Sequence, residues 1–360
     1  MKKSPTPFLV SALLAVSLSA QTSWVVTPGN PTNLQTAIDQ ASAGDEILVQ
    51  AGTYNMFSLN KGLTVRAVQP GTVFLVDVSF FNLISIPAGE HAHLVGLDGP
   101  DMFIIGQGTT TVEDSRWSSQ GIVITVGFGP AHFERCVIEA QPFFVGAQAC
   151  VTVSGTLTAV DTVIRGASGG VTGTTSPALD LQSGTLIGTA LTLEGGTGSF
   201  SSSAIVADSA SVIRLSDSIV TGGGATCSIS GGDAECVRCT VSAPCNVQPG
   251  TMLGMWASGG VTRGQPYVLD FRGEPNEFVL VFGSNEVDLF HSVDLQLPFL
   301  LSAPGCFAAT ALMTDGSGHA SVTWQLPNAT LPPAVGLWFQ GVSGSSFPLA
   351  TSTVVGGMVR

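Results

Sequence analysis

The sequence contains very little positive charge. Lysine and arginine together number 12 in 360 residues, and Lys61 is the single lysine after the first three positions. Nucleic acids and anionic membranes are bound through clusters of Lys and Arg that face their phosphates. A chain with a formal net charge of −13 is therefore not expected to bind either kind of partner.

Long apolar runs are also missing, apart from a short one at the N-terminus. Lys2 and Lys3 precede the mostly apolar segment 8–18, and small residues follow it up to Ala20. A positive start, a short apolar segment and a zone of small residues are typical of a secretory signal. We therefore expect residues 1–20 to be a signal peptide.

The signal predicts export, to the extracellular space, the cell surface or the periplasm. Its cleavage position is open: Ser17 and Ser19 fit a cut after Ser19, and Leu18 disfavours a cut after Ala20. Removal of the leader changes the formal charge from −13 to −15. No later stretch contains the roughly 18 consecutive apolar residues of a membrane span, so we expect none.

Charged residues of both signs are scarce, at 10% of the chain, whereas an average globular protein has about 25%. Residues that favour helices are few, and glycine is abundant, with 44 copies. Abundant Gly, Ser, Thr and Val with few charges indicate short strands and many turns, and so an all-β protein. The length allows about two domains, which we place at residues 21–249 and 250–360.

From Gly121 onward the chain can be written as five stacked lines of similar pattern. Each begins with a short alternating strand and turns at Gly, Ala or Ser, and a second strand then leads to a shared element that reads VIEA, VIRG, TLEG, IVTG and TVSA. The first residues of this element are Val137, Val163, Thr192, Ile219 and Thr240, at spacings of 26, 29, 27 and 21 residues. Such a period predicts a solenoid, in which each coil buries its apolar face against its neighbours.

An exposed first edge of such a solenoid would invite aggregation unless it were covered. The segment NPTNLQTAIDQASAGDEILVQAGTY, residues 30–54, is suited to cover it. Thr32 and Gln35 have capping-box spacing, and apolar residues from Leu34 to Ala41 recur on one helical face. We expect a helix that ends at Gly44, seals the core of the first coil and leads into the first strand.

The stretch LQTAIDQASAGDEILVQAGTY, followed by KGLTVRA, resembles the N-terminal segment of the right-handed parallel β-helix, or pectin-lyase-like, superfamily. The resemblance covers roughly residues 24–245. It implies the fold. It also implies one of two activities. The lyases of this superfamily use Asp or Glu ligands for Ca²⁺ and an Arg or Lys base, and its hydrolases use clustered aspartates as acid and base. The Asn-Thr-Asp, Asp-Asp and Gly-His-Gly motifs of the polygalacturonase-like hydrolases are absent.

The repeat disappears after Pro249. The segments YVLDFRG, EFVLVFG, HASVTWQLP and VGLWFQGV alternate apolar and polar residues between turn signals, which predicts a small antiparallel β-sandwich. This region resembles a C-terminal module of secreted bacterial proteins. Trp256, Trp324 and Trp338 offer a sugar-stacking surface, but we favour core packing because Trp324 and Trp338 lie within strand-like alternation.

One column of the shared element carries charge. Glu139, Arg165 and Glu194 follow the second apolar position of successive lines, so stacking predicts an acid–base–acid ladder on an outer face. Arg165 is a weak candidate for a proton abstractor or carboxylate binder. We favour structural ion pairing, because two carboxylates keep the guanidinium protonated and repel an acidic sugar.

A second acidic cluster lies in GLDGPDMFIIGQGTTTVEDSRWSS. Its candidate residues for glycan or ion binding are Asp98, Asp101, Glu113, Asp114, Arg116 and Trp117. Its carboxylates could supply oxygen ligands to Ca²⁺, but no EF-hand or nonapeptide repeat is present, and the preferred interpretation is solvated turn residues. We assign no metal.

The chain has seven cysteines: Cys136, Cys150, Cys227, Cys236, Cys239, Cys245 and Cys306. An odd number leaves at least one thiol unpaired within the chain. Cys227 aligns with Cys150, Leu179 and Ile205 at inward positions, and Cys136 and Cys239 align with Thr162, Leu191 and Ser218. No histidine is spaced to pair with a nucleophilic cysteine, and we expect one bridge among Cys236, Cys239 and Cys245.

The sequence thus predicts an exported, all-β protein with a capped parallel β-helix and a β-sandwich. The favoured function is non-catalytic, with binding of extracellular or cell-surface glycan. The alternatives are a polysaccharide lyase or hydrolase of the same fold, and an adhesion protein. An enzyme requires several carboxylates and an arginine within about 6 Å of one another in an open groove.

Overall fold

The computed structural model describes residues 22–359, except for residues 30–32, 77–80, 143–147, 170–174, 199–201, 225–227, 244–246, 250–251, 259–260, 286, 291–294, 296–298, 302–305, 327–335 and 345–348. The chain forms two compact units, the coil unit Thr22–Met252 and the C-terminal unit that begins at Leu253. The predicted signal peptide, Thr32, Cys227 and Cys245 lie outside the described residues.

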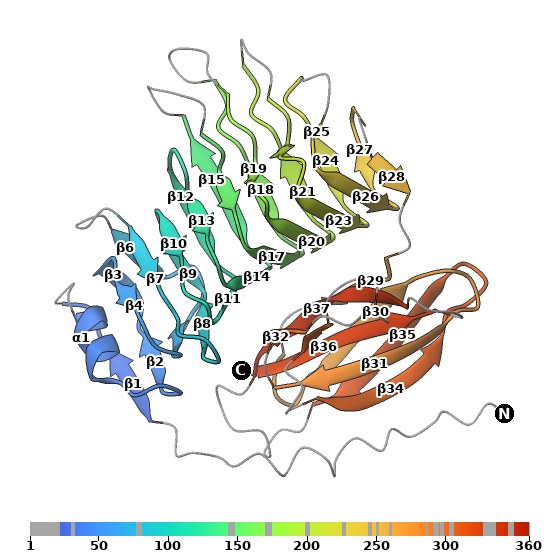
Figure 1. Cartoon of the computed structure of the whole chain (residues 1–360). Coiled ribbons are helices and arrows are strands. Elements are labelled where there is room, and N and C mark those ends of the chain that lie inside the picture. Colours follow the sequence, from blue (N-terminus) through green and yellow to red (C-terminus); the bar gives the residue numbers. More distant parts are fainter. Residues whose placement is uncertain are drawn as a thin grey trace. The chain divides into compact units, whose positions relative to one another are not determined.

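The coil unit is a parallel β-helix, as predicted, with three long parallel sheets (Figure 1). Sheet A contains β1 (Ser23–Val26), β2 (Glu46–Val49), β5 (Thr64–Ala67), β8 (His91–Val95), β11 (Thr109–Glu113), β14 (Pro130–Glu134), β17 (Thr156–Val160), β20 (Thr185–Thr189), β23 (Val212–Ser216), β26 (Asp233–Val237) and β28 (Val247–Pro249). Sheet B contains β3 (Gly52–Asn55), β6 (Val73–Val76), β9 (Leu97–Gly99), β12 (Arg116–Gln120), β15 (Val137–Gln141), β18 (Val163–Arg165), β21 (Thr192–Glu194), β24 (Ile219–Thr221) and β27 (Thr240–Val241). Sheet C contains β4 (Ser58–Leu59), β7 (Asn82–Ile84), β10 (Met102–Ile104), β13 (Ile124–Val126), β16 (Val151–Val153), β19 (Leu179–Leu181), β22 (Ile205–Ala207) and β25 (Ile229–Ser230).

The register of the predicted shared element is confirmed. Val137, Val163, Thr192, Ile219 and Thr240 are successive in-register partners along sheet B. The next residue of each strand points inward, and Ile138, Ile164, Leu193 and Val220 are fully buried. Because side chains alternate along a strand, this register gives every coil the same inward face, and one core runs through the unit.

The register of sheet C differs from the prediction by one residue. Leu179 pairs with Val151 and Ile205 pairs with Leu179, so this row continues from Val151 rather than from Cys150, which lies just before the strand. Cys150 is nevertheless fully buried, so its predicted role as a small core residue is confirmed. The pairing of Cys227 lies outside the described residues.

Helix α1 (Asn33–Gln40) is the predicted cap. Its residues Leu34, Ala37 and Ile38 are buried in the core of the coil unit. A strand that the prediction missed, β1, precedes the helix and pairs in parallel with β2, so β1 is the first edge of sheet A. The Gln35 side chain bonds both backbone polar groups of Ser58, with its Oε1 accepting from the N–H at 2.7 Å and its Nε2 donating to the carbonyl at 3.2 Å.

Asp45 connects the cap to the first strand. Its Oδ1 accepts a hydrogen bond from the Thr22 N–H at 2.9 Å, and its Oδ2 accepts bonds from the Ser42 N–H at 2.9 Å and the Trp24 indole at 3.2 Å. The helix ends at Gln40, four residues before the predicted end at Gly44, and Gly44, with φ of 90°, lies in the turn that leads from the helix to β2. The Gly-Asp pair therefore closes the N-terminal end of the solenoid.

The C-terminal unit consists of antiparallel sheets, as predicted. Sheet D contains β29 (Gly254–Ser258), β30 (Pro266–Arg272) and β35 (His319–Gln325). Sheet E contains β34 (Phe307–Met313), β31 (Phe278–Ser284), β36 (Gly336–Ser343) and β37 (Ala350–Met358), and β32 (Val287–Phe290) pairs with β33 (Phe299–Leu301). Trp324 of sheet D stacks on Phe339 of sheet E with ring centroids 4.6 Å apart, so the two sheets share a core.

The preferred interpretation of the tryptophans is confirmed for two of them. Trp324 is 4% exposed and Trp338 is fully buried, so neither offers a face to a sugar. Trp256 is half-buried, with the Arg272 guanidinium carbon 5.5 Å from its ring centroid. Among the described residues, no helix is both long and apolar enough to cross a membrane.

Candidate functional site

The densest group of charged side chains lies where sheet A turns into sheet B. On β14, Ala131 and Phe133 point into the core, so alternation places His132 and Glu134 on the outer face. Glu134 is the in-register partner of Glu113 on β11. Like charges directly opposite each other are destabilising unless a cation lies between them.

In six successive coils, one residue other than glycine makes the turn from sheet A to sheet B in the left-handed conformation. These residues are Asp114, Arg135, Asp161, Ala190, Asp217 and Arg238, with φ between 47° and 55°. Their N–H groups bond to the next coil: Asp114 donates to the Glu134 carbonyl at 3.0 Å, and Arg135 donates to the Val160 carbonyl at 3.1 Å. The turn residues therefore stack, and their side chains meet those of neighbouring coils.

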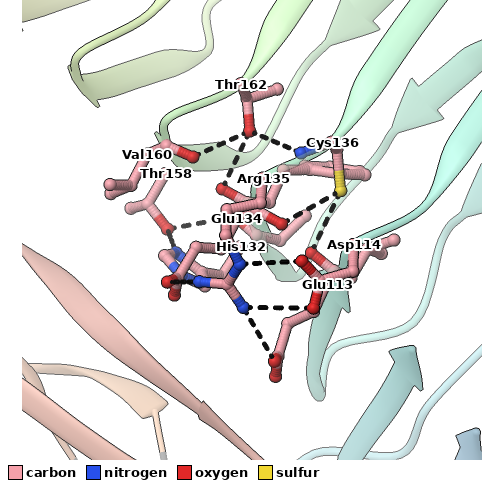
Figure 2. Close-up of polar contacts among 12 residues, drawn as sticks. Glu113, Asp114, His132, Glu134, Arg135, Cys136, Thr158, Val160 and Thr162 are labelled. Atoms are coloured by element: carbon pink, nitrogen blue, oxygen red, sulfur yellow. Dashed lines mark hydrogen bonds and ion pairs between the residues drawn. The ribbon is translucent and has the colours of Figure 1, made fainter. Parts of the chain in front are cut away.

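Arg135 supplies the cation of the cluster, as Figure 2 shows. Its Nε lies 2.8 Å from Asp114 Oδ1, and its Nη2 lies 3.5 Å from Glu113 Oε2. Its Nη1 contacts Glu134 Oε1. Three carboxylates from two coils thus share one guanidinium.

His132 extends the cluster on the same outer face (Figure 2). Its Nδ1 lies 2.8 Å from the Thr158 hydroxyl, and its Nε2 lies 3.6 Å from Glu134 Oε2. The prediction missed His132, Glu134 and Arg135. The pattern of Asp or Arg directly before Ser, Thr or Cys, which recurs in four of the five lines, was the signal that could have found Arg135.

In five of these six turns the next residue closes the turn with its hydroxyl or thiol, and Leu191 takes this place after Ala190. Thr162 donates to the Val160 carbonyl at 2.9 Å and accepts from the Cys136 N–H at 3.3 Å. Ser115, Ser218 and Cys239 make the same bond to the carbonyl two residues earlier. The predicted alignment of Cys136 with Thr162 is confirmed, and burial raises the pKa of the Cys136 thiol to about 12, so that it is not a nucleophile at neutral pH.

The predicted ladder on sheet B is also confirmed. Arg165 pairs in register with Glu139 and Glu194, with Nη1 2.7 Å from Glu139 Oε1 and Nε 2.7 Å from Glu194 Oε2. Arg116 adds a fourth charge, with Nη2 2.7 Å from Glu139 Oε2. Burial alone would raise the pKa of Glu139, but the bonds from Arg165 and Arg116 hold it below its ordinary value. The hydrogen bonds that Arg165 donates to Glu139 and Glu194 raise the pKa of Arg165, which makes it a poor proton abstractor.

The predicted acidic cluster does not form one site. Glu113 and Asp114 meet at Arg135, whereas Arg116 joins the ladder on sheet B. Asp98 is the in-register partner of Arg116, and burial raises its pKa while Arg116 opposes that shift.

Asp101 and Trp117 also lie away from Arg135. The Asp101 carbonyl accepts bonds from the Asn82 backbone N–H and side-chain amide, each at 2.9 Å. Trp117 is fully buried in the core opposite Ile138, so the prediction that it contacts glycan is wrong.

Every arginine of the coil unit forms an ion pair with a carboxylate of an adjacent coil. The six are Arg66, Arg116, Arg135, Arg165, Arg214 and Arg238. Lys61 donates to the Ala41 carbonyl at 2.7 Å, just beyond α1. Within the described ranges, no three His, Cys, Asp or Glu side chains are arranged to hold a metal ion, so these residues give no support to a Ca²⁺ site.

The distance part of the criterion for an enzyme is met, because Glu113, Asp114 and Glu134 lie within 3.5 Å of Arg135.

Comparisons with known proteins find only distant structural likenesses. No protein family and no curated protein matches the chain. Among solved structures, the PL6 family alginate lyase AlyGC is 14% identical, with a TM-score of 0.35, over 65% of this chain; the chain spans 40% of that enzyme's length.

Two further solved structures are more distant. The A-module of the mannuronan C-5 epimerase AlgE4 from Azotobacter vinelandii is 10% identical, with a TM-score of 0.22, over 61% of this chain and 94% of its own. Tailspike protein 2 of the Escherichia coli O157:H7 bacteriophage CAB120 is 9% identical, with a TM-score of 0.17, over 94% of this chain and 64% of its own. Likenesses this distant carry no argument about activity, which depends on the residues of this chain.

Proposed function

We propose that the protein is an exported, non-catalytic β-helix that binds neutral extracellular or cell-surface glycan along its coils. The observation that carries this proposal is the pairing of all six arginines of the coil unit with carboxylates of adjacent coils. A uronate carboxylate needs a cation as its partner, and an elimination at a uronate needs a base that can accept a proton. Paired guanidinium groups supply neither.

Sheet C offers the face best suited to a neutral sugar. Phe103, Thr125 and Thr152 are successive in-register partners, and each is partly exposed on the outer side. The Phe81 ring lies beside that of Phe103, with centroids 4.6 Å apart, and is 39% exposed. Aromatic rings next to hydroxyl groups provide an apolar surface for a sugar ring and hydrogen-bond partners for its hydroxyls.

The proposal is tested by binding of the full-length protein to immobilised neutral polysaccharides, with polygalacturonate and alginate as acidic comparators. We expect saturable binding to at least one neutral glycan, weakened several-fold by Phe103→Ala and by Thr152→Ala. Thr192→Ala on sheet B is the matched control, because Thr192 is likewise half-exposed on an outer face. A preference for acidic polysaccharide, or an equal loss in the control, contradicts the proposal.

The convergence of Glu113, Asp114 and Glu134 on Arg135 favours a second candidate, a polysaccharide lyase or hydrolase. Neighbouring carboxylates are the acid and base of glycoside hydrolysis. This candidate predicts turnover that Glu134→Gln abolishes without unfolding the protein, whereas the favoured proposal predicts no turnover.

A further inference from the structure

Two cysteines lie three residues apart at the turn of the last complete coil. Cys236 is the fourth residue of β26 and pairs in register with Leu215, which is fully buried. Arg238 makes the left-handed turn, with φ of 54°, and Cys239 follows it. Both cysteines pack against the core of the coil unit.

These two positions of the turn point toward each other, as an earlier coil shows. Gly188 and Leu191 hold the equivalent places, since Gly188 pairs with Leu215 and Leu191 precedes the shared element as Cys239 does. A Cβ atom added at Gly188 would lie 2.3 Å from Leu191 Cδ1. Residues with side chains at both of these turn positions therefore lie in contact with each other.

In the last coil this contact joins two thiols. The hydrogen bond between Cys239 and Cys236 lowers the pKa of Cys239, and the same bond, with burial, raises that of Cys236. Both side chains are half-buried, so small reagents can reach them. Cys136 occupies the same turn position four coils earlier, but it is 1% exposed and its counterpart three residues back is Phe133.

We infer that Cys236 and Cys239 are a reactive dithiol that closes to a disulfide across the turn by exchange with a low-molecular-weight disulfide. The Cys239 thiolate attacks one sulfur of the reagent, forming a mixed disulfide and releasing one reagent thiolate. The Cys236 thiol then loses its proton and its sulfur attacks Cys239 Sγ, which releases the second reagent thiolate. The protein loses two electrons and two protons, and one reagent disulfide becomes two thiols.

The bond would fasten β26 to the start of β27 at the far end of the solenoid. It would thereby hold the last turn in its folded geometry, where fewer neighbouring coils support it than in the middle of the stack. The sequence left three pairings open among Cys236, Cys239 and Cys245. Cys236 and Cys239 are free thiols in the structure, and the bond we infer between them belongs to the oxidised protein.

Trypsin provides the test, because Arg238 lies between the two cysteines. Cleavage at Arg214, Arg238 and Arg263 puts Cys227 and Cys236 in one peptide and Cys239 and Cys245 in the next. In the full-length variant Cys227→Ser/Cys245→Ser, the two peptides can be joined only through Cys236 and Cys239. After equilibration with oxidised glutathione we expect the joined peptides by mass spectrometry, and two separate alkylated peptides after equilibration with reduced glutathione.

The unmodified protein gives the second measurement, in case that variant does not fold. Digestion with trypsin and a glutamyl protease also cuts after Glu235, which separates Cys227 from Cys236, and fragmentation then locates the bond. We expect the tripeptide 236–238 joined to the following peptide at Cys239, and Cys136 unoxidised as the internal control. Joining through Cys245, glutathione retained on Cys239 without closure, or free Cys236 and Cys239 under oxidising conditions overturns the inference.

Discussion

Arg165 and Glu139 are direct partners in the register of sheet B, and Arg165 Nη1 lies 2.7 Å from Glu139 Oε1. The same guanidinium contacts Glu194 of the following coil. The ion pair therefore runs along the solenoid axis, from coil to coil, instead of pointing at a ligand. The arginines of the coil unit share this arrangement, which is why we assign them to the architecture.

The two charge clusters should differ in their contribution to stability. Arg165→Met removes pairs whose members are 42%, 18% and 42% exposed, so we expect a loss below about 1 kcal/mol. Arg135→Met leaves Glu113, Asp114 and Glu134 facing one another with little exposure, and we expect a loss of about 3 kcal/mol. Urea unfolding of both full-length variants measures the difference, and equal losses would show that burial does not separate the clusters as described.

Asp45 should make the stability of the coil unit depend on pH. Burial opposes ionisation, but hydrogen bonds from Ser42, Thr22 and Trp24 hold the folded-state pKa of Asp45 below its ordinary value of 3.8. Its stabilising effect is therefore fully present above the unfolded-state pKa and is lost as the pH falls through the lower folded-state pKa.

We expect Asp45→Asn to cost about 1–3 kcal/mol at pH 7, because the amide replaces one acceptor oxygen by a donor. The gap between the variant and the unmodified protein should shrink below about pH 4, where the carboxylate begins to be protonated in the unfolded chain. Unfolding free energies across the acid range test this. A gap that stays constant or widens at low pH would contradict the assignment of these bonds to the ionised carboxylate.

The inward hydroxyl of Thr162 at the turn should contribute more to stability than the outward hydroxyl of Thr125. Thr162→Val leaves the buried Cys136 N–H without its acceptor at 3.3 Å, and we expect a loss of about 1–3 kcal/mol. Thr125→Val makes the same chemical change on the half-exposed outer face of sheet C, where we expect an effect within about 0.5 kcal/mol. Thermal or urea unfolding of the pair decides the matter, and a Thr162→Val protein as stable as the control would show that this hydroxyl is dispensable.

The N-terminal cap should stabilise the first coil through its apolar face. Ile38 is 1% exposed, so Ile38→Ala should cost about 2–4 kcal/mol. We also expect faster self-association near the unfolding transition, because a loosened helix uncovers strand edges. Light scattering during heating measures the second effect, and Thr36→Ala, on the exposed side of the same helix, is the control.

The coil architecture was predictable because each line repeats a short pattern whose apolar positions face inward. The five residues from Val137 to Thr240 gave the register of sheet B, and Glu139 and Arg165 then had to meet. Trp117 was misplaced although the same rule applies: it pairs with Ile138, an inward residue, and alternation alone would have buried it.

Strand β1 and the Arg135 cluster were not predicted, because no periodic pattern in the sequence marks them. Strand β1 is four residues long and separated from its partner β2 by the helix, so no local alternation marks it. The Arg135 cluster forms between coils of unequal length. Asp114 and Arg135 are turn residues, whereas Glu113 and Glu134 are the last residues of strands β11 and β14. Stacking of left-handed turn residues, not hydrophobic periodicity, brings Asp114 to Arg135.

Turnover on a panel of neutral and acidic polysaccharides tests the non-catalytic assignment most directly. The full-length protein should bind a neutral glycan while producing neither unsaturated ends, seen by ultraviolet absorbance, nor new reducing ends. Release of either product by the purified protein, together with its loss in a folded Glu134→Gln or Arg135→Met variant, would contradict the account and make the Arg135 cluster an active site.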